Sequence, residues 1–314
     1  MRIGAHVSTA GSLPQAMDRA VRLGCECAQI FVGNPRQWRA ATYADEELAE
    51  FSRRRAAAGV APLVAHAPYL VNLATPDPGL HALGVDALVR GLGVMEAVGG
   101  LGVVTHIGSA KGAPADEALA RVAAAVREAL ARTERAVVLL ENSAGGTLGG
   151  SFAELRVLLD RLDGAPRVAV CLDSAHLFAA GVDLRREADV TAMLDEFDRV
   201  VGLGRLGLWH LNDSRSALGS RLDRHENIGA GAIGRAGFRA LLREPRLAHL
   251  GGVLETPGFD GQGPDLRNMR ALRRLRGDRA ARRALGGGEP AAAVQRRAPV
   301  LLADRREEDR GILG

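Results

Sequence analysis

Lysine is almost absent from this 314-residue chain: Lys111 is the only one, so arginine carries nearly all of the positive charge behind a formal net charge of +4. Cysteine is also scarce. Three cysteines (Cys25, Cys27 and Cys171) without a second closely spaced pair argue against a disulfide framework or a zinc knuckle. We expect all three to be small core residues.

Long apolar runs are missing as well. None approaches the ~20 residues that a membrane-spanning helix needs. The first residues show no charged segment followed by a long apolar stretch, which a secretory signal would need. We therefore expect a cytoplasmic protein that does not enter a membrane.

The excess of arginine has two interpretations. Much Ala, Gly and Arg with almost no Lys is what a GC-rich genome produces, and the charge taken alone favours this explanation. The alternative is a surface for nucleic acid, because a planar guanidinium donates two hydrogen bonds at once to a phosphate.

Short apolar segments alternate with longer amphipathic ones along most of the chain. The predicted strands are residues 3–7, 28–32, 62–66, 101–106, 136–141, 168–173, 206–211 and 252–255. Between them lie helical patterns, such as residues 115–132 and 152–162. Eight short, buried strands that alternate with helices predict an α/β protein, a single-domain (β/α)8 TIM barrel over residues 1–275.

The main alternative is an open, doubly wound sheet. No G-x-G-x-x-G sequence follows the first strand, which argues against a nucleotide-binding sheet of that type. Residues 276–314 are rich in Ala and Arg and mixed in charge, and we expect them to form a flexible tail with no assigned function.

Residues suited to metal binding stand at or beside the ends of six predicted strands. They are His66, His106, Glu141, Asp173, His210 and Glu255. All strands of a barrel end at one face, so these side chains should converge there. One such histidine would more often be a core or supporting group, but six are improbable as a packing effect.

Three further residues, His176, Asp223 and His225, lie in the adjoining loops. Carboxylate oxygens offset the charge of a divalent cation, and neutral imidazole nitrogens give it directional bonds. We predict one metal cluster built from these nine residues.

Other polar positions near the cluster stay open. His6, near the end of the first strand, could orient a ligand and is left out of the ligand set. Asn142 and the pair Asn212–Asp213 directly follow predicted ligands, and they could hydrogen-bond either to ligands or to loops.

Two loops carry arginine and aromatic residues. Arg36 and Trp38 follow the second strand, and Tyr69 and Leu70 follow the third. Arginine beside exposed rings at a barrel mouth suits contact with phosphates and insertion between unstacked bases. From these residues alone, the favoured interpretation is that Trp38 and Tyr69 anchor their loops by packing.

The motifs together resemble a known family, endonuclease IV, the zinc-dependent apurinic/apyrimidinic endonucleases. The resemblance runs from residue 2 to about 275. It rests on GAHVS (4–8), NPRQWRA (34–40), HAPYLVNLA (66–74), HIGS (106–109), ENSAG (141–145), CLDSAHLFAAG (171–181), HLNDS (210–214), GSRLDRHENIG (219–229) and LETPG (254–258).

The resemblance implies three zinc ions. Manganese could replace zinc in part, because the two metals compete for sites built from nitrogen and oxygen ligands. The implied ligand sets are His66, His106 and Glu141; Glu141, Asp173, His210 and Glu255; and His176, Asp223 and His225. Glu141 would bridge two ions about 4 Å apart, which would activate a shared water as hydroxide. Glu255 would orient that hydroxide, and the third ion would stabilise the departing 3′ oxygen.

The implied substrate is duplex DNA with an abasic site. Cleavage on the 5′ side of that site would leave a 3′-hydroxyl and a 5′-deoxyribose phosphate. The resemblance places Arg36, Tyr69 and Leu70 in the DNA stack, and it suggests a monomer. The rival hypothesis is a metal-dependent sugar isomerase or epimerase of the xylose-isomerase type, which has no evident need for the third ligand set or for an arginine-rich loop at the mouth.

Overall fold

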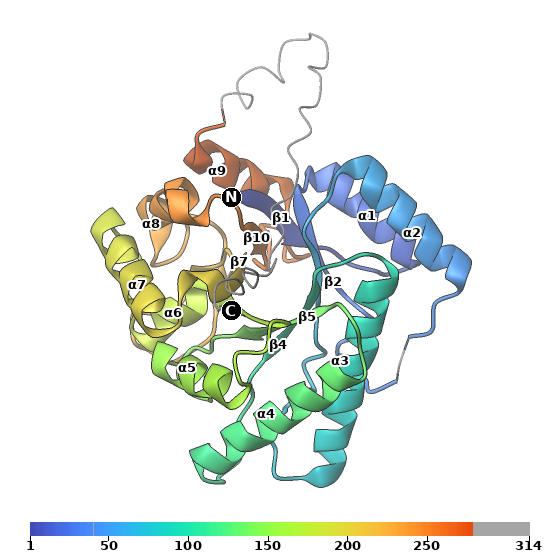
Figure 1. The fold of residues 1–314 in the computed structure, drawn as a ribbon. Helices are drawn as coiled ribbons and strands as arrows, with labels where there is room; N and C mark the ends of the chain where they lie inside the picture. Colours follow the sequence, from blue (N-terminus) through green and yellow to red (C-terminus); the bar gives the residue numbers. More distant parts are fainter. Residues whose placement is uncertain (40, 279–314) are drawn as a thin grey trace, which may run out of the picture.

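The computed structural model describes residues 1–39 and 41–278, and within them the chain forms a closed barrel of parallel strands surrounded by helices (Figure 1). The strand order around the barrel is β1-β10-β7-β6-β5-β4-β3-β2. These strands are β1 (Arg2–His6), β2 (Cys27–Phe31), β3 (Leu63–His66), β4 (Gly102–His106), β5 (Val137–Glu141), β6 (Val168–Asp173), β7 (Leu206–His210) and β10 (Gly251–Leu254). The predicted TIM barrel is confirmed.

The helices form the outer ring (Figure 1). They are α1 (Leu13–Leu23), α2 (Asp45–Ala58), α3 (Pro78–Ala97), α4 (Ala115–Ala131), α5 (Phe152–Arg161), α6 (Ser174–Ala180), α7 (Glu187–Val200), α8 (Gly234–Arg243) and α9 (Leu266–Arg276), with short 3-10 turns at Leu203–Arg205 and Pro245–Leu247. Within the described residues, no helix is long and apolar enough to cross a membrane.

All eight predicted strands match the observed ones to within one residue at each end. The predicted barrel ended at residue 275, whereas α9 continues to Arg276, whose side chain is held by Glu26 and Asp278. The rest of the predicted tail, from residue 279, lies outside the described residues.

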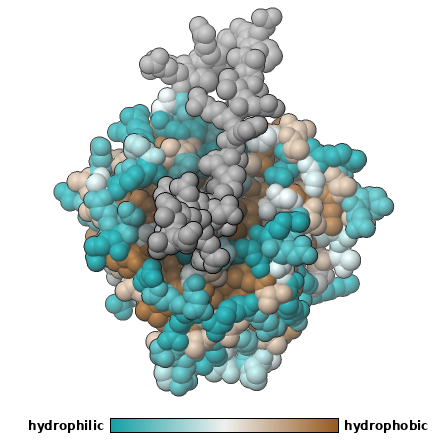
Figure 2. All heavy atoms as spheres, in the orientation of Figure 1, coloured by the Kyte–Doolittle hydropathy of each residue, from teal (hydrophilic) through white to brown (hydrophobic). Residues whose placement is uncertain are grey.

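Apolar side chains fill the space between the barrel and its helices, where a large continuous core is buried. Hydrophilic residues cover much of the outer rim in Figure 2, and hydrophobic residues show between the helices. The three cysteines are buried and unbridged, as predicted. Burial of this apolar surface is the main force that holds the helices on the barrel.

The inside of the barrel is built in layers. An apolar layer takes one residue from each of seven strands: Cys27, Val64, Val104, Leu139, Cys171, Leu208 and Val253. Side chains alternate along a strand, so the residue two positions later points the same way, one layer nearer the mouth. Those residues form a polar layer: Gln29, His66, His106, Glu141, Asp173, His210 and Glu255.

A small hairpin lies beyond β7. Strands β8 (Asp213–Ser214) and β9 (His225–Glu226) pair in antiparallel fashion, with Ser214 opposite His225. This pairing brings a segment that is remote in sequence from the strand ends back toward the mouth. Two-residue strands have no hydrophobic periodicity, so no sequence pattern predicts them.

Candidate metal centre

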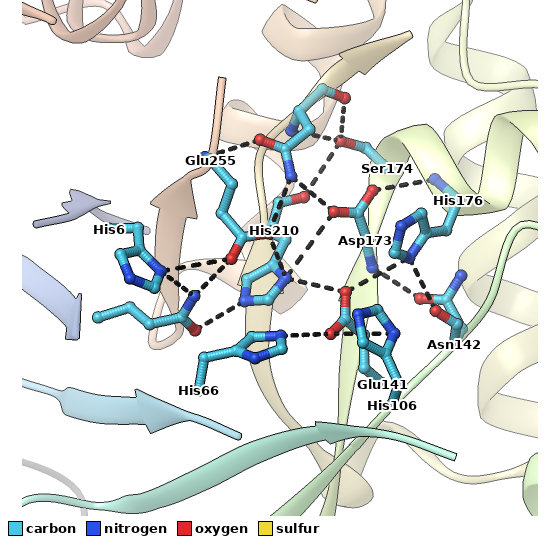
Figure 3. A network of polar contacts seen from close by, with 12 residues as sticks. His6, His66, His106, Glu141, Asn142, Asp173, Ser174, His176, His210 and Glu255 are labelled. Atoms are coloured by element: carbon cyan, nitrogen blue, oxygen red, sulfur yellow. Dashed lines mark hydrogen bonds and ion pairs between the residues drawn. The ribbon is translucent and has the colours of Figure 1, made fainter. Parts of the chain in front are cut away.

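All nine predicted ligand residues lie in one network of short contacts at the mouth of the barrel, the greater part of which Figure 3 shows. Six of them come from the ends of successive strands. His176 comes from the first turn of α6. Asp173 caps this helix, and the Asp173 Oδ1 accepts a hydrogen bond from the His176 main-chain nitrogen at 2.9 Å. His225 comes from the β8–β9 hairpin, and Asp223 from the loop before it.

Glu141 is the centre of the network and is almost fully buried. Its Oε2 lies 3.2 Å from His66 Nε2 and 3.7 Å from His106 Nδ1. Its Oε1 lies 3.1 Å from His210 Nδ1 and 3.3 Å from His176 Nδ1. Burial would raise the pKa of Glu141, but the imidazoles of His106, His210 and His66 outweigh it and hold the pKa well below its usual range.

Three groups of these side chains bring their ligand atoms within 4.8 Å of one another and could hold a metal ion. They are His66, His106 and Glu141; Glu141, Asp173, His210 and Glu255; and Asp173, His176 and His225. The first two equal the sets that the resemblance implied. In the third, Asp173 stands where the resemblance placed Asp223.

Asp223 nevertheless contacts both histidines of the third group. Its Oδ2 lies 3.2 Å from His176 Nε2, and its Oδ1 lies 3.3 Å from His225 Nε2. Asp173 Oδ2 is slightly farther from His225 Nε2, at 3.6 Å. Asp173 is therefore positioned between the second and third groups.

Three of the histidines have one ring nitrogen occupied by a main-chain oxygen and the other directed at carboxylates. The Nδ1 atoms of His66, His176 and His225 lie 2.7, 2.9 and 3.3 Å from the main-chain oxygens of Ala67, Asn142 and Glu255. When Nδ1 donates to a carbonyl, the Nε2 lone pair is left for a metal ion. The buried Nε2 of His225 has no hydrogen-bond partner among the described residues.

The donor set fits divalent cations. A neutral imidazole directs a lone pair at carboxylate oxygens, and acceptor atoms repel one another unless a cation or a proton lies between them. Without a metal, protons take this place. Burial lowers the pKa of His176, but Asp173, Asp223 and Glu141 outweigh it and raise the pKa to about 10.

The residues that the sequence left open have supporting positions. Asn142 accepts a hydrogen bond from the Asp173 main-chain nitrogen at 2.7 Å. Asn212 donates to Asp173 Oδ2 at 2.6 Å and accepts from the Glu255 main-chain nitrogen at 2.8 Å. His6 Nδ1 lies 3.6 Å from Glu255 Oε1.

Asp213 serves a loop instead of the cluster. Its carboxylate accepts hydrogen bonds from the main-chain nitrogens of Ser214, Gly229, Gly231, Ile233 and Gly234.

Gln29 is the polar residue that the sequence analysis missed. It is fully buried and contacts His6, His210 and Glu255. The available signal was its place two residues after Cys27, in the same register as the strand-end ligands of the other strands.

A cavity of about 1210 Å³ opens over the cluster. Arg36 and Tyr69 line it together with His66, His106, Glu141 and His225. Tyr69 is 61% exposed and Leu70 is 40% exposed. The main-chain nitrogen of Tyr69 donates to Pro35 O at 3.0 Å, which ties the two mouth loops together. Trp38, in contrast, packs against the core and anchors its loop.

The fold and this constellation define the class of the protein. Residues 17–276 match a family described as the xylose isomerase-like TIM barrel. "Probable endonuclease 4" of Halothermothrix orenii is 38% identical over 277 residues, which cover 87% of this chain and 100% of that protein. The protein of the same name from Methanoculleus marisnigri is 40% identical over 279 residues, 88% of this chain and 99% of its own length.

Solved structures narrow the class further. The crystal structure of endonuclease IV from Thermus thermophilus matches with a TM-score of 0.78 and 37% identity, and it covers 88% of this chain and 98% of that one. The chain belongs to the endonuclease IV family. A 3-keto-D-glucoside 4-epimerase from E. coli, with a TM-score of 0.62 and 17% identity over 88% of this chain and 99% of its own, shares the fold alone.

Proposed function

We propose that this protein is a metal-dependent DNA-repair endonuclease. It hydrolyses the phosphodiester bond on the 5′ side of an abasic site in duplex DNA. The bond between phosphorus and the 3′ oxygen of the preceding nucleotide breaks, water supplies the new oxygen on phosphorus, and the products are a 3′-hydroxyl and a 5′-deoxyribose phosphate. The observation that carries the proposal is the convergence of all nine residues at the mouth, in a chain of this family.

The nine residues would hold three zinc ions, with manganese able to replace zinc in part. Four carboxylates and five neutral imidazoles supply the negative charge and directional donors that such ions need. Bound ions would lower the pKa of a water molecule and offset charge on the phosphate.

Two carboxylates have distinct roles in this proposal. Glu141 belongs to both the first and the second ligand group, so it would be the carboxylate that the two groups share. Glu255 lies at the edge of the cavity, with Oε1 held by Gln29 at 2.5 Å and Oε2 3.2 Å from His210 Nδ1. This fixed carboxylate would accept a hydrogen bond from the attacking water and orient it toward phosphorus.

Arg36, Tyr69 and Leu70 would contact the DNA. Tyr69 and Leu70 expose apolar surface at the mouth beside a cationic loop, which suits insertion into a base stack. A nucleotide without a base has already lost its stacking, so rotating it out of the duplex costs less, by a few kcal/mol at most. The protein could then select the abasic nucleotide without contacts that distinguish one base from another.

A direct test uses zinc-loaded protein and a duplex with one tetrahydrofuran abasic analogue. We expect a single incision 5′ to the analogue, with a 3′-hydroxyl that a polymerase extends, and no cut in the matching intact duplex. Removal of zinc by a chelator should abolish incision, and adding zinc back should restore it. Absence of incision, with turnover of a ketose or aldose instead, would support the sugar isomerase hypothesis.

A further inference from the structure

Gln29 is an amide among charged and imidazole side chains. It lies on β2, in the polar layer, and none of its surface is exposed. From there it contacts two residues of the second ligand group, His210 on β7 and Glu255 after β10. The strands that carry His210 and Glu255 are remote from β2 in sequence, so Gln29 connects β2 to both of these residues across the barrel interior.

The three contacts of Gln29 fix the direction of its amide. Nε2 lies 2.5 Å from Glu255 Oε1 and 2.9 Å from His6 Nδ1, and Oε1 lies 2.9 Å from His210 Nε2. If the amide were flipped, so that its oxygen and nitrogen exchanged places, its oxygen would lie against the Glu255 carboxylate. Nε2 therefore donates one proton to Glu255 and one to His6, while Oε1 accepts from His210.

This assignment settles which nitrogen of His210 is free. Because Nε2 donates to Gln29, Nδ1 is the atom that faces Glu141 Oε1 at 3.1 Å and Glu255 Oε2 at 3.2 Å. The three histidines with main-chain partners obtain the same effect from backbone carbonyls. His210 alone among these four depends on a side chain, which can be replaced without changing the backbone.

We propose that Gln29 is the positioning residue of the second ligand group. It holds His210 with the proton on Nε2 and Nδ1 directed inward, and it holds Glu255 Oε1 so that Oε2 faces the same point. This inference rests on the proposed metal centre. It goes further by assigning the capture of one particular ion, at Glu141, Asp173, His210 and Glu255, to an uncharged residue that does not bind the ion.

The test compares Gln29→Met with the wild-type protein. Methionine keeps the length and most of the volume but offers neither a strong donor nor a strong acceptor. With free zinc buffered by a competing chelator, the wild-type protein should hold three ions per chain. Gln29→Met should hold two ions at the same free zinc. It should bind the ion of the second ligand group at least about 10-fold more weakly, which is the scale of loss when the supporting partner of a ligand is removed.

A nuclear magnetic resonance measurement reports on His210 without any substrate. In zinc-loaded wild-type protein labelled with ¹⁵N-histidine, the His210 Nε2 proton should exchange slowly with water, because Gln29 accepts it in a buried site. In Gln29→Met this proton should exchange at least about 10-fold faster, since a hydrogen-bonded buried proton exchanges only through local opening.

Gln29→Glu is the second variant. It keeps an acceptor for His210 but lacks the donor to Glu255. It should therefore keep the slow Nε2 proton, while the loss of the donor to Glu255 should still weaken zinc binding relative to the wild-type protein. If the methionine variant fails to fold, this variant still tests the proposal, because rapid exchange of the His210 proton in it would overturn the assignment.

Asn268 offers a matched control. It is also a fully buried amide, and it hydrogen-bonds to Asn227, Asp265 and Ile228, none of which belongs to the cluster. Asn268→Leu should lower the melting temperature and leave three zinc ions bound. Equal zinc affinity in wild type and Gln29→Met would reject the role of Gln29, whereas a wild-type protein without zinc would reject the metal centre itself.

Discussion

Arg276 and Glu26 form a bidentate ion pair across 250 residues of sequence, with Nη1–Oε2 and Nη2–Oε1 distances of 2.6 and 2.7 Å. The same guanidinium donates to the main-chain oxygen of Met1 at 2.7 Å, and Glu26 accepts from the Ile3 main-chain nitrogen at 2.9 Å. The pair therefore fastens α9 to β1, where the barrel closes.

Glu26→Gln should lower stability in a pH-dependent way. Burial raises the pKa of Glu26, but its hydrogen bonds and the charge of Arg276 outweigh burial and lower the pKa. A carboxylate with a lowered folded-state pKa stabilises the fold above its unfolded value of about 4.3, and this is lost as pH falls through the folded value. Because the site is partly exposed, we expect a loss of about 1 kcal/mol at pH 7 that shrinks below pH 4.

Urea denaturation of both proteins from pH 3 to pH 8 measures this difference. Glu50→Gln is the control, because Glu50 pairs with Arg53 and Arg54 within α2 and does not connect the two ends of the barrel. A difference between wild type and Glu26→Gln that stays constant over this range would contradict the prediction.

Asp213→Ala should destabilise the mouth of the barrel. It removes the acceptor of five main-chain N–H groups in and after β8, two of them buried and three partly buried, and leaves those donors without their partner. A loss of about 2–4 kcal/mol is expected from thermal or urea unfolding, since each buried unpaired donor costs about 1–3 kcal/mol before relaxation. Asp260→Ala, which frees one exposed N–H of Gln262, should change stability by less than about 0.5 kcal/mol.

Asp223→Ala should reduce the metal content selectively. Among the ligand groups, Asp223 contacts only the histidines of the third, so dialysed protein should retain two zinc ions instead of three. Asp173→Ala should lose more zinc than Asp223→Ala, because Asp173 contacts histidines of two ligand groups. Its Oδ2 lies 3.8 Å from His210 Nδ1 and 3.6 Å from His225 Nε2. Three zinc ions retained in Asp223→Ala, by elemental analysis, would show that the third group does not depend on Asp223.

Tyr69→Ala and Arg36→Ala should weaken binding to a duplex with an abasic analogue by about 10-fold each, at unchanged zinc content, because each removes a contact worth about 1–2 kcal/mol. Arg36→Ala should also reduce the salt dependence of binding, since one fewer phosphate counterion is released. Val21→Ala, at an exposed apolar position on α1, is the control. Fluorescence anisotropy measures all three, and undiminished affinity in Tyr69→Ala would remove that residue from the interface.

The strand-end residues were predictable because two simple patterns coincide at each of them. A short apolar run marks a buried strand, and parallel barrel strands all end at one face. His66, His106 and Glu141 therefore fall together without any knowledge of side-chain conformation. The strand boundaries followed to within one residue for the same reason.

The supporting residues were not predictable in this way. Whether Asn142 and Asn212 serve ligands or loops depends on where each amide group points, which the folded backbone decides. Gln29 was missed because glutamine is not a common metal ligand, although its register with Cys27 was visible. The β8–β9 hairpin was missed because its pairing depends on tertiary contacts, among them those of Asp213.

The apolar layer of the barrel lies one pleat below the cluster and is almost completely excluded from solvent. Among the described residues, the open approach of water, protons and chelators to the proposed ions is therefore the cavity above them. A duplex seated on the mouth would cover that cavity. Loss of zinc should then be slowest while the enzyme is occupied by DNA, so that the substrate itself retains the ions that cut it.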